Sequence, residues 1–272
     1  MTQPAFFRHL HHQPIGFIDS GVGGLSVLRE VKKILPREQV IYIADAAFAP
    51  YGEKSAEAVR ARMTKLTDYL VQQNIKALVI ACNTATAAAI DSLRARYAIP
   101  IIGVEPALKF AAAVTRSHVV GVLATAGTLA SKRYVNLARR YGQEINILAQ
   151  ACPDLVKQIE RQPFNCLETE AMVKHYVTPM LGAGMDTLVL GCTHFPIVKS
   201  MIRTVTGNKV NILDTALPVA HQLRKRLRHE YLLSSDMHKG DLLLATGDIA
   251  TLHRFVPYAG LRKFKVQVLP DL

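Results

Sequence analysis

A stretch of eight residues that occurs twice constrains the fold of this chain more than any other feature. Residues 77–84 read Ala-Leu-Val-Ile-Ala-Cys-Asn-Thr, and residues 187–194 read Thr-Leu-Val-Leu-Gly-Cys-Thr-His. A short apolar run followed by small and then polar residues is typical of a parallel strand that is buried on both faces and opens into a loop at its carboxyl end. Each copy therefore places one cysteine, Cys82 or Cys192, at the end of a buried strand, where open α/β sheets bind their ligands.

Other segments recur in the same order along the chain. The further matched pairs are 15–20 with 120–125, 42–46 with 147–151, and 104–107 with 213–216. The spacing within the matched pairs stays between 105 and 110 residues. We infer two βα repeats that are related by approximate symmetry.

These repeats predict an α/β protein with two pseudo-symmetric βα domains, mainly parallel sheets, and an active site in the cleft between the domains. The tail after residue 216 contains further strand patterns at 241–246 and 264–268. Because both repeats are already complete, we expect this tail to return to the first domain. The predicted domains are residues 1–104 together with 216–272, and residues 105–215.

Composition narrows the class of protein. The chain has 272 residues, of which 50% are hydrophobic, and this is enough for two substantial cores. Its four cysteines include no Cys-x-x-C pair and follow no apparent leader, so we expect reduced thiols and a cytoplasmic protein rather than a secreted disulfide framework. The longest apolar stretches are shorter than the roughly 18 residues of a membrane span, so no membrane partner is expected.

The net charge of +12 raises the question of a nucleic-acid partner. The charge is spread evenly, because residues 1–104, 105–215 and 216–272 each carry +4. The one dense basic run, residues 224–229, lies in a helical pattern and is expected to be a solvated face. Nucleic acid is therefore not expected as the primary partner.

The first 13 residues show no sustained hydrophobic periodicity, and we expect them to form an extension. They contain His9, His11 and His12, but no other ligand follows at a spacing typical of a metal site. We expect no metal site in this protein.

The loops after the first two predicted strands carry candidate binding residues. Asp19 and Ser20 follow the strand at 15–18, and the glycines after them either form a tight strand-to-helix turn or point backbone N–H groups at an anion. After the strand at 40–44, residues 45–55 are expected to form a long loop, which turns at Pro50, Tyr51 and Gly52. Ser55 is expected to cap the next helix.

Two cysteines that face one site from opposite sides suit racemisation. A thiolate removes a proton from one face of a carbon acid, and a thiol on the other face returns one. Cys82 precedes a helix whose dipole lowers a thiol pKa. A single buried cysteine is often only a small hydrophobic residue. We interpret Cys152 and Cys166 as structural in this way, because neither occurs at matching positions in both repeats.

Polar residues around the two cysteines fit an amino-acid substrate. Asp19 is placed to receive an ammonium group, and His194 is placed to tune Cys192 if a carboxylate orients it. The residues expected to bind carboxylates with hydroxyl, amide and N–H groups are Ser20, Asn83, Thr84, Thr125 and Thr193.

These motifs together resemble the glutamate racemases, within the cofactor-independent aspartate/glutamate racemase family. The resemblance covers residues 15–216 and rests on the segments at 19–25, 50–52, 81–84 and 191–194. It implies interconversion of L- and D-glutamate without pyridoxal phosphate or metal, which supplies D-glutamate for bacterial peptidoglycan. It also implies that Cys82 takes the α-proton of D-glutamate and Cys192 that of L-glutamate, with Asp19 and His194 assisting.

By the same resemblance, Pro50, Tyr51 and Gly52 belong to the substrate-binding set. The family has a glutamate partner for the histidine eight residues after an Ala-Cys-Pro segment, and here that position is Glu160. The match is incomplete, because Lys157 stands where the family often has proline. We also expect a homodimer.

Three other functions remain open at this stage. A related racemase or decarboxylase would keep the fold and act on another acid, although a decarboxylase needs only one protonating cysteine. A Cys-His hydrolase built on Cys192 and His194 leaves Cys82 unexplained. A nucleic-acid-binding protein would use the charge but not the cysteines.

Overall fold

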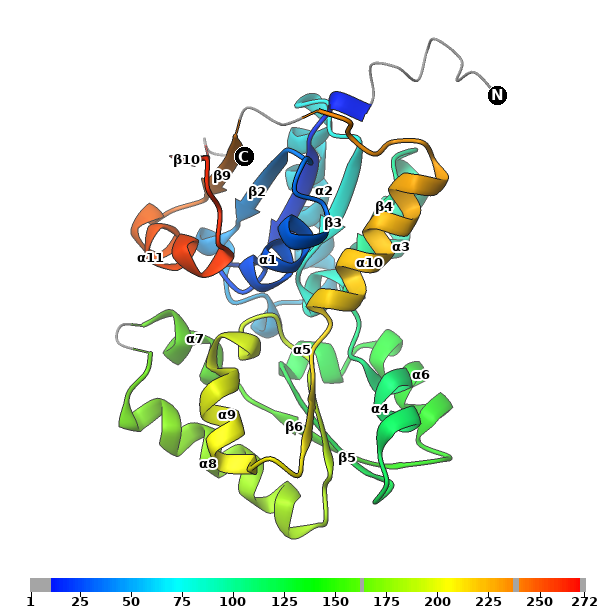
Figure 1. Cartoon of the computed structure of the whole chain (residues 1–272), viewed down its shortest axis with the longest axis vertical. Helices are drawn as coiled ribbons and strands as arrows, with labels where there is room; N and C mark the ends of the chain where they lie inside the picture. Colours follow the sequence, from blue (N-terminus) through cyan, green and yellow to red (C-terminus); the bar gives the residue numbers. More distant parts are fainter. Residues whose placement is uncertain (1–10, 162–163, 237–239, 270–272) are drawn as a thin grey trace. The chain divides into compact units, whose positions relative to one another are not determined.

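The computed structural model describes residues 11–161, 164–236 and 240–269 of the chain. The chain divides into two compact units. Unit 1 contains Met1–Val104 and Ala216–Leu272, and unit 2 contains Glu105–Thr215. Each unit is built on one sheet of parallel strands with helices on both faces, which confirms the predicted α/β class (Figure 1).

Six strands form the sheet of unit 1. They are β1 (Ile15–Asp19), β2 (Val40–Ala44), β3 (Ala77–Ile80), β4 (Ile101–Gly103), β9 (Asp241–Ala245) and β10 (Phe264–Val268). Their order across the sheet is β10-β9-β2-β1-β3-β4. The tail of the chain thus returns to unit 1, where β9 pairs with β2.

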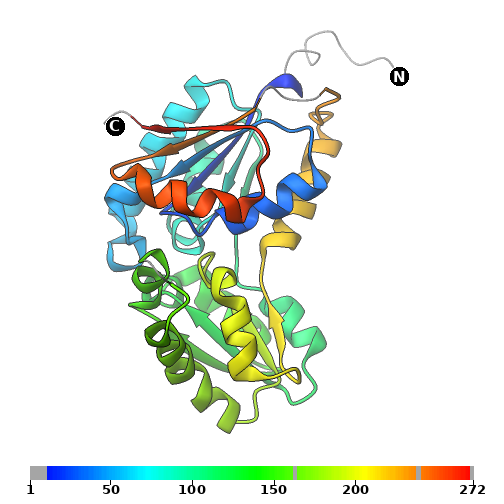
Figure 2. The ribbon, with the colours of Figure 1, turned by 60° about the vertical axis from the view of Figure 1, so that its left-hand side comes forward.

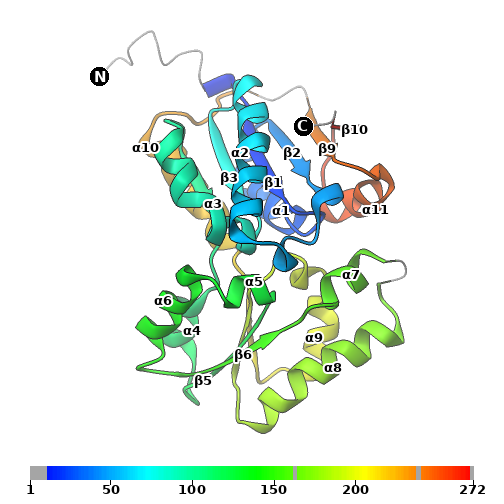
Figure 3. The same ribbon diagram turned by 180° about the vertical axis from the view of Figure 1, so that it is seen from behind.

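Helices cover both faces of this sheet. They are α1 (Leu25–Ile34), α2 (Ala56–Gln72), α3 (Asn83–Arg96), α10 (Ala216–His229) and α11 (Ile249–Ala259). Helices α2 and α3 pack together on one face, and α1 packs with α10 and α11 on the other (Figures 1 and 3). As expected, Ser55 caps α2, because its Oγ accepts a hydrogen bond from Ala58 N at 3.2 Å.

Unit 2 repeats the central part of this design. Its strands are β5 (Val119–Ala124), β6 (Asn146–Ala151), β7 (Thr187–Leu190) and β8 (Asn211–Leu213), in the order β6-β5-β7-β8. Its helices are α4 (Leu108–Val114), α5 (Ala126–Leu129), α6 (Lys132–Tyr141), α7 (Leu155–Glu160), α8 (Leu167–Gly182) and α9 (Lys199–Thr206). Helices α4 and α6 lie on one side of the sheet, and α8 and α9 lie on the other (Figure 1).

The strand registers relate the two units residue by residue and correct two of the predicted matches. Ile15 pairs with Val40 in unit 1, and Val120 pairs with Ile147 in unit 2, so Ile147 is equivalent to Val40 and not to Tyr42. The same comparison makes β8 equivalent to β4 with a shift of two residues from the predicted match. Since side chains alternate along a strand, a shift of two keeps every residue on its own face, and the sequence pattern alone does not detect it.

The loop after β2, residues 45–55, contains two 3₁₀ turns, Ala46–Phe48 and Tyr51–Glu53, and the second coincides with the predicted turn. The expectation for the basic run is confirmed, because its charged residues lie on the exposed face of α10 while Leu223 and Leu227 are buried. In the described parts of the chain, every helix is too short or too polar to cross a membrane.

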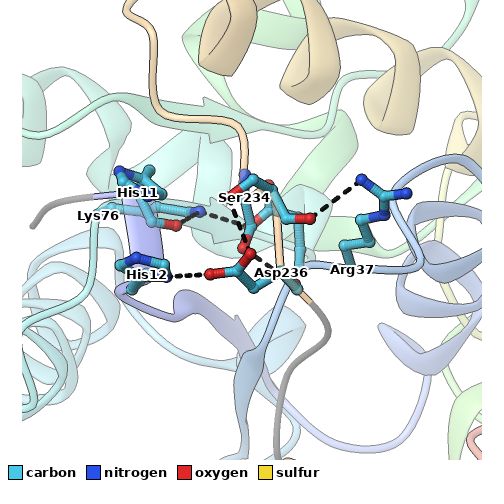
Figure 4. Close-up of polar contacts among 8 residues, drawn as sticks. His11, His12, Arg37, Lys76, Ser234 and Asp236 are labelled. Carbon is cyan, nitrogen blue, oxygen red and sulfur yellow. Dashed lines mark hydrogen bonds and ion pairs between the residues drawn. The ribbon is translucent and has the colours of Figure 1, made fainter. Parts of the chain in front are cut away.

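A buried ion pair fastens three distant segments of unit 1 (Figure 4). The Lys76 ammonium lies against the Glu38 carboxylate, and both side chains are almost fully buried. Lys76 Nζ also donates to His11 O at 2.6 Å, and Glu38 Oε1 accepts from Ser234 N at 2.8 Å. Burial lowers the pKa of Lys76, and the Glu38 carboxylate opposes this shift. The pair therefore joins the start of the described chain to the segment before β9.

Two weaker contacts reinforce this junction at the surface. Arg37 Nη1 donates to Ser235 O at 3.0 Å, and His12 Nδ1 lies 3.5 Å from Asp236 Oδ2 (Figure 4). Of the three N-terminal histidines, His11 thus contacts Lys76 and His12 contacts Asp236, and His9 lies outside the described residues.

Replacing Lys76 with methionine is expected to lower the free energy of unfolding by about 3 to 5 kcal/mol, because Glu38 is then left buried and unpaired. Chemical denaturation measures the change. Lys65→Met on the exposed face of α2 is the matched control and should have little effect. The double variant Lys76→Met with Glu38→Met should recover most of the loss; a double variant as unstable as the sum of its parts would contradict a coupled pair.

Candidate active site

The first part of the candidate site lies at the carboxyl end of β1. Asp19 is fully buried, and its Oδ2 accepts a hydrogen bond from Gly21 N at 3.1 Å. A Cβ atom at Gly24 would lie 2.8 Å from Asp19 Cβ and 2.8 Å from Tyr42 Oη, so only glycine fits there. The glycine segment is therefore a tight strand-to-helix turn that holds the Asp19 carboxylate in place.

Cys82 lies two residues beyond β3 and is the N-cap of α3. Its Sγ accepts a hydrogen bond from Ala85 N at 3.5 Å and donates one to Ser20 Oγ at 3.7 Å. The free N–H groups and the dipole at a helix N-terminus stabilise negative charge. Cys82 thus lies at a helix N-terminus and beside a hydroxyl group.

Asn83, beside Cys82, has an unusual environment. Its side chain is buried, and neither its amide nitrogen nor its amide oxygen has a hydrogen-bond partner among the described residues. Leaving such a group unpaired costs about 1 to 3 kcal/mol, so a buried free amide indicates a place for a ligand. Thr84, the next residue, is also buried.

A polar network after β2 was not expected from the sequence. The fully buried Asp45 accepts hydrogen bonds from Arg62 Nη2 at 2.6 Å, Tyr51 Oη at 2.7 Å and Thr246 Oγ1 at 2.7 Å. The only local signal was the position of Asp45 at a strand end; its partners are distant in the sequence.

This network changes the interpretation of the loop at Pro50, Tyr51 and Gly52. Burial, followed by the Asp45 carboxylate, raises the pKa of Tyr51, so its hydroxyl stays protonated and donates to Asp45. The Tyr51 ring packs in the same core cluster as Cys82. The Tyr51 side chain therefore holds the loop in place, whereas Pro50 and Gly52 are half-buried.

The second part of the candidate site lies at the carboxyl end of β7. Cys192 is buried, and its Sγ lies 3.9 Å from His194 Nδ1. His194 Nε2 in turn lies 2.8 Å from Glu160 Oε1, which is the hydrogen bond that we expected between these two residues. Burial alone lowers the pKa of His194, but the contacts with Cys192 and Glu160 outweigh it and raise this pKa well above its usual range. The His194 ring thus lies between a thiol and a carboxylate.

The two threonines predicted in unit 2 occupy different places. Thr125 follows β5 and caps α5, because its Oγ1 accepts from Thr128 N at 3.2 Å. Thr193 is buried between Cys192 and His194 in the chain. The other two cysteines are as expected for structural residues. Burial raises the pKa of Cys152 to about 12, and Cys166 Sγ lies 3.4 Å from Thr169 Oγ1.

Cys82 and Cys192 occupy equivalent positions in the two sheets. Ala81 N donates to Ile18 O at 2.8 Å, and Gly191 N donates to Leu123 O at 2.7 Å, so each cysteine follows the same ladder bond. By this equivalence His194 occupies the position of Thr84. The residues that surround the two thiols nonetheless differ.

The predicted site residues divide between the two units. Unit 1 holds Asp19, Ser20, Pro50, Tyr51, Gly52, Cys82, Asn83 and Thr84, and unit 2 holds Thr125, Glu160, Cys192, Thr193 and His194. Over the described ranges, no three His, Cys, Asp or Glu side chains gather in a way that could hold a metal ion.

Comparison with known proteins gives consistent matches over most of the chain. Residues 15–223 match the model of the Asp/Glu/Hydantoin racemase family. A glutamate racemase from Ectopseudomonas mendocina is 46% identical over 90% of this chain and 93% of its own length. The crystal structure of a glutamate racemase isoform from Bacillus anthracis superposes with a TM-score of 0.87 at 33% identity, covering 96% of this chain and 98% of that chain. A glutamate racemase from Francisella tularensis, in complex with D-glutamate, gives 0.82 at 28% identity, covering 96% and 98%.

Two parallel sheets with a thiol at the same strand end in each, together with these matches, define an amino-acid racemase, which is an isomerase. The chain belongs to the Asp/Glu/Hydantoin racemase family.

Replacing Glu160 with glutamine is expected to lower the pKa of His194, because the carboxylate that stabilises the imidazolium is removed. In the unmodified protein the charged pair stabilises the fold below the ordinary histidine pKa of about 6.5, and this stability is lost as the pH rises through the raised value. NMR titration of the histidine ring measures the pKa directly. The exposed Glu168 on α8 supplies the control Glu168→Gln. The same His194 pKa in the unmodified protein, in Glu160→Gln and in Glu168→Gln would exclude Glu160 as the partner that sets this pKa.

Proposed function

We propose that this protein interconverts L-glutamate and D-glutamate by proton transfer at the α-carbon, with Cys82 and Cys192 as the two acid–base groups and with no metal or pyridoxal phosphate. The observation that carries the proposal is the equivalence of the two cysteines, each of which follows the same ladder bond at a strand end of its sheet. A mechanism with a single catalytic thiol would leave the second cysteine at the equivalent position unexplained.

Two thiols account for inversion of configuration. One cysteine, as thiolate, takes the α-proton from one face of the substrate, and the electron pair is delocalised into the α-carboxylate. The other cysteine, as thiol, donates its proton to the opposite face, which yields the other enantiomer. The enzyme then carries the thiolate on the other side, and the reverse reaction restores the first state.

The surroundings of each thiol support a different means of activation. The N-terminus of α3 stabilises the Cys82 thiolate, and the His194 imidazolium stabilises the Cys192 thiolate. By the resemblance to the family, Cys82 acts on D-glutamate and Cys192 on L-glutamate. Glu160 then keeps His194 charged and oriented, and is a positioning residue.

The groups in unit 1 fit the functional groups of an amino acid. The free Asn83 amide is suited to a substrate carboxylate, and the buried Asp19 carboxylate is suited to the ammonium group. We assign Ser20, Thr84, Thr125 and Thr193 to carboxylate binding as well, and we assign the backbone of Pro50 and Gly52 to the rim of the site. Tyr51 fixes this rim through Asp45.

Glutamate is the substrate that the relatives favour. The similar proteins from Ectopseudomonas mendocina and Bacillus anthracis are named glutamate racemases, and the one from Francisella tularensis was crystallised with D-glutamate. We further propose that the product serves peptidoglycan synthesis in a bacterial cytoplasm and that the chain acts as a homodimer.

The first test of this proposal is substrate choice. Purified protein treated with a chelator should racemise each enantiomer of glutamate, and circular dichroism follows the loss of optical activity. Aspartate enantiomers serve as the comparison, because their shorter side chain places the second carboxylate differently. A preference for aspartate, or activity that returns only with added metal or pyridoxal phosphate, would contradict the proposal.

The second test separates the two bases. Cys82→Ala and Cys192→Ala should each lower racemisation by about 10²- to 10⁴-fold or more in both directions, because inversion needs one thiolate and one thiol. Each variant should still eliminate a β-leaving group from an analogue of the enantiomer that faces its remaining cysteine, and the two variants should prefer opposite enantiomers. Cys166→Ala is the control, because Cys166 precedes α8 and follows no strand, and it should be dispensable.

Racemisation in heavy water tests the same mechanism independently. With two separate bases, the product of the earliest turnovers carries deuterium while the remaining substrate keeps its proton. Return of the original proton to the product, or full activity in either alanine variant, would show that one group serves both faces.

A further inference from the structure

A cavity in unit 1 lies at the amino ends of strands β9 and β10, whereas Cys82 lies beyond the carboxyl end of β3. Its volume is about 620 Å³, within the usual range of roughly 300 to 1,000 Å³ for ligand pockets. Asp241, the first residue of β9, and Lys263, the residue before β10, lie in its wall, whereas Cys82 lies two residues beyond the end of β3. Because all the strands are parallel, the cavity and Cys82 lie at opposite ends of the strands of one sheet. Helices α1 and α11, whose C-terminal parts form the cavity, lie side by side in Figure 2.

The lining of this cavity is strongly basic. Its charged residues are Arg29, Lys32, Lys33, Arg262, Lys263 and the single acidic residue Asp241. Lys32 serves the fold, because its Nζ lies 3.0 Å from Asp241 Oδ1 and donates to Glu38 O at 2.8 Å. Lys32 and Asp241 therefore cancel each other.

Among the described residues, the remaining four cations form ion pairs with one carboxylate, that of Glu30. Glu30 Oε1 lies 3.1 Å from Arg29 Nε and 2.9 Å from Lys33 Nζ, so one acidic group is shared by two basic groups. Arg262 and Lys263 are exposed, and no carboxylate of the described chain forms an ion pair with either.

A structural reason for some of these cations is the pair of helix ends. Helix α1 ends at Ile34 and α11 at Ala259, and each C-terminus carries roughly half a negative charge. Two half charges and Glu30 offset about two of the four cations. About two positive charges remain uncompensated, and Arg262 and Lys263 lie beyond the last turn of α11.

The cavity also has an apolar wall. Pro36, Ala259 and Leu261 line it, and Gly260 allows the sharp turn between α11 and Leu261 through its left-handed backbone, with a φ of 65°. The wall therefore offers an apolar surface next to a cluster of cations.

We propose that this cavity is a binding site for a small organic phosphate. The phosphate dianion would be bound by Arg262 and Lys263, with Arg29 and Lys33 nearby, and the organic part would rest on Pro36, Ala259 and Leu261. Arginine binds phosphate through paired N–H donors, and two uncompensated positive charges match a dianion. The site is independent of the proposed racemase reaction, because none of its lining residues belongs to the candidate active site.

Phenyl phosphate is the probe that tests this site, since it combines a dianion with an apolar ring. Isothermal titration calorimetry on the full chain, with excess L-glutamate present, should show binding that is tighter than that of inorganic phosphate. The double variant Arg262→Gln with Lys263→Gln should weaken phenyl phosphate binding by about tenfold or more, because two charge-assisted contacts are lost.

The matched control is Arg224→Gln with Lys225→Gln on the exposed face of α10, which removes the same two residue types and the same charge from unit 1. This control should bind phenyl phosphate as the unmodified protein does. Thermal unfolding of both double variants shows whether they fold, and Lys33→Gln provides a second variant of the cavity with a smaller loss. Absence of binding at millimolar phenyl phosphate, an equal loss in the control, binding that occurs only when L-glutamate is left out, or equal affinity for inorganic phosphate would each overturn the proposal.

Discussion

The burial of the central strands of each parallel sheet on both faces is the constraint on which the rest of the structure depends. Every residue of β1, β2, β3 and β7 is buried, so the backbone must pair within the sheet and each connection must return over a face as a helix. All carboxyl ends of the strands in a unit therefore meet at one edge. Asp19, Asp45 and Cys82 come from three different strands and become neighbours for this reason alone.

The central strands and both thiol positions could be predicted because they depend on local pattern. A short, mostly apolar run lies two residues before a cysteine in both units, and the structure makes these runs β3 and β7. The exact register could not be predicted, since a shift of two residues preserves the alternation of faces. The hydrogen bond between His194 and Glu160 was predictable only through resemblance to a family, because 34 residues separate the two side chains.

Contacts between distant segments account for what the sequence did not show. Asp45 binds Thr246 across 201 residues, and no local pattern marks this pairing. Lys76 is similar, because lysine is rarely buried, and its partner Glu38 comes from another connection of the same unit. The Tyr51 side chain packs inward and donates to Asp45, a contact that no local pattern marks. Only tertiary contacts therefore decide whether a polar residue at a strand end binds a ligand or supports the fold.

The pairing of β9 with β2 has a consequence for the synthesis of the chain. Unit 2 is continuous, so its four-stranded sheet can close once β8 has left the ribosome. Unit 1 cannot finish at that time, because β2 remains an open edge strand until about 30 residues beyond β8 have been added and β9 can cover it. The nascent protein therefore passes through a stage in which unit 2 is complete while strand β2 of unit 1 still exposes unpaired backbone groups. A stop or pause in translation between β8 and β9 would release a chain prone to edge-to-edge aggregation.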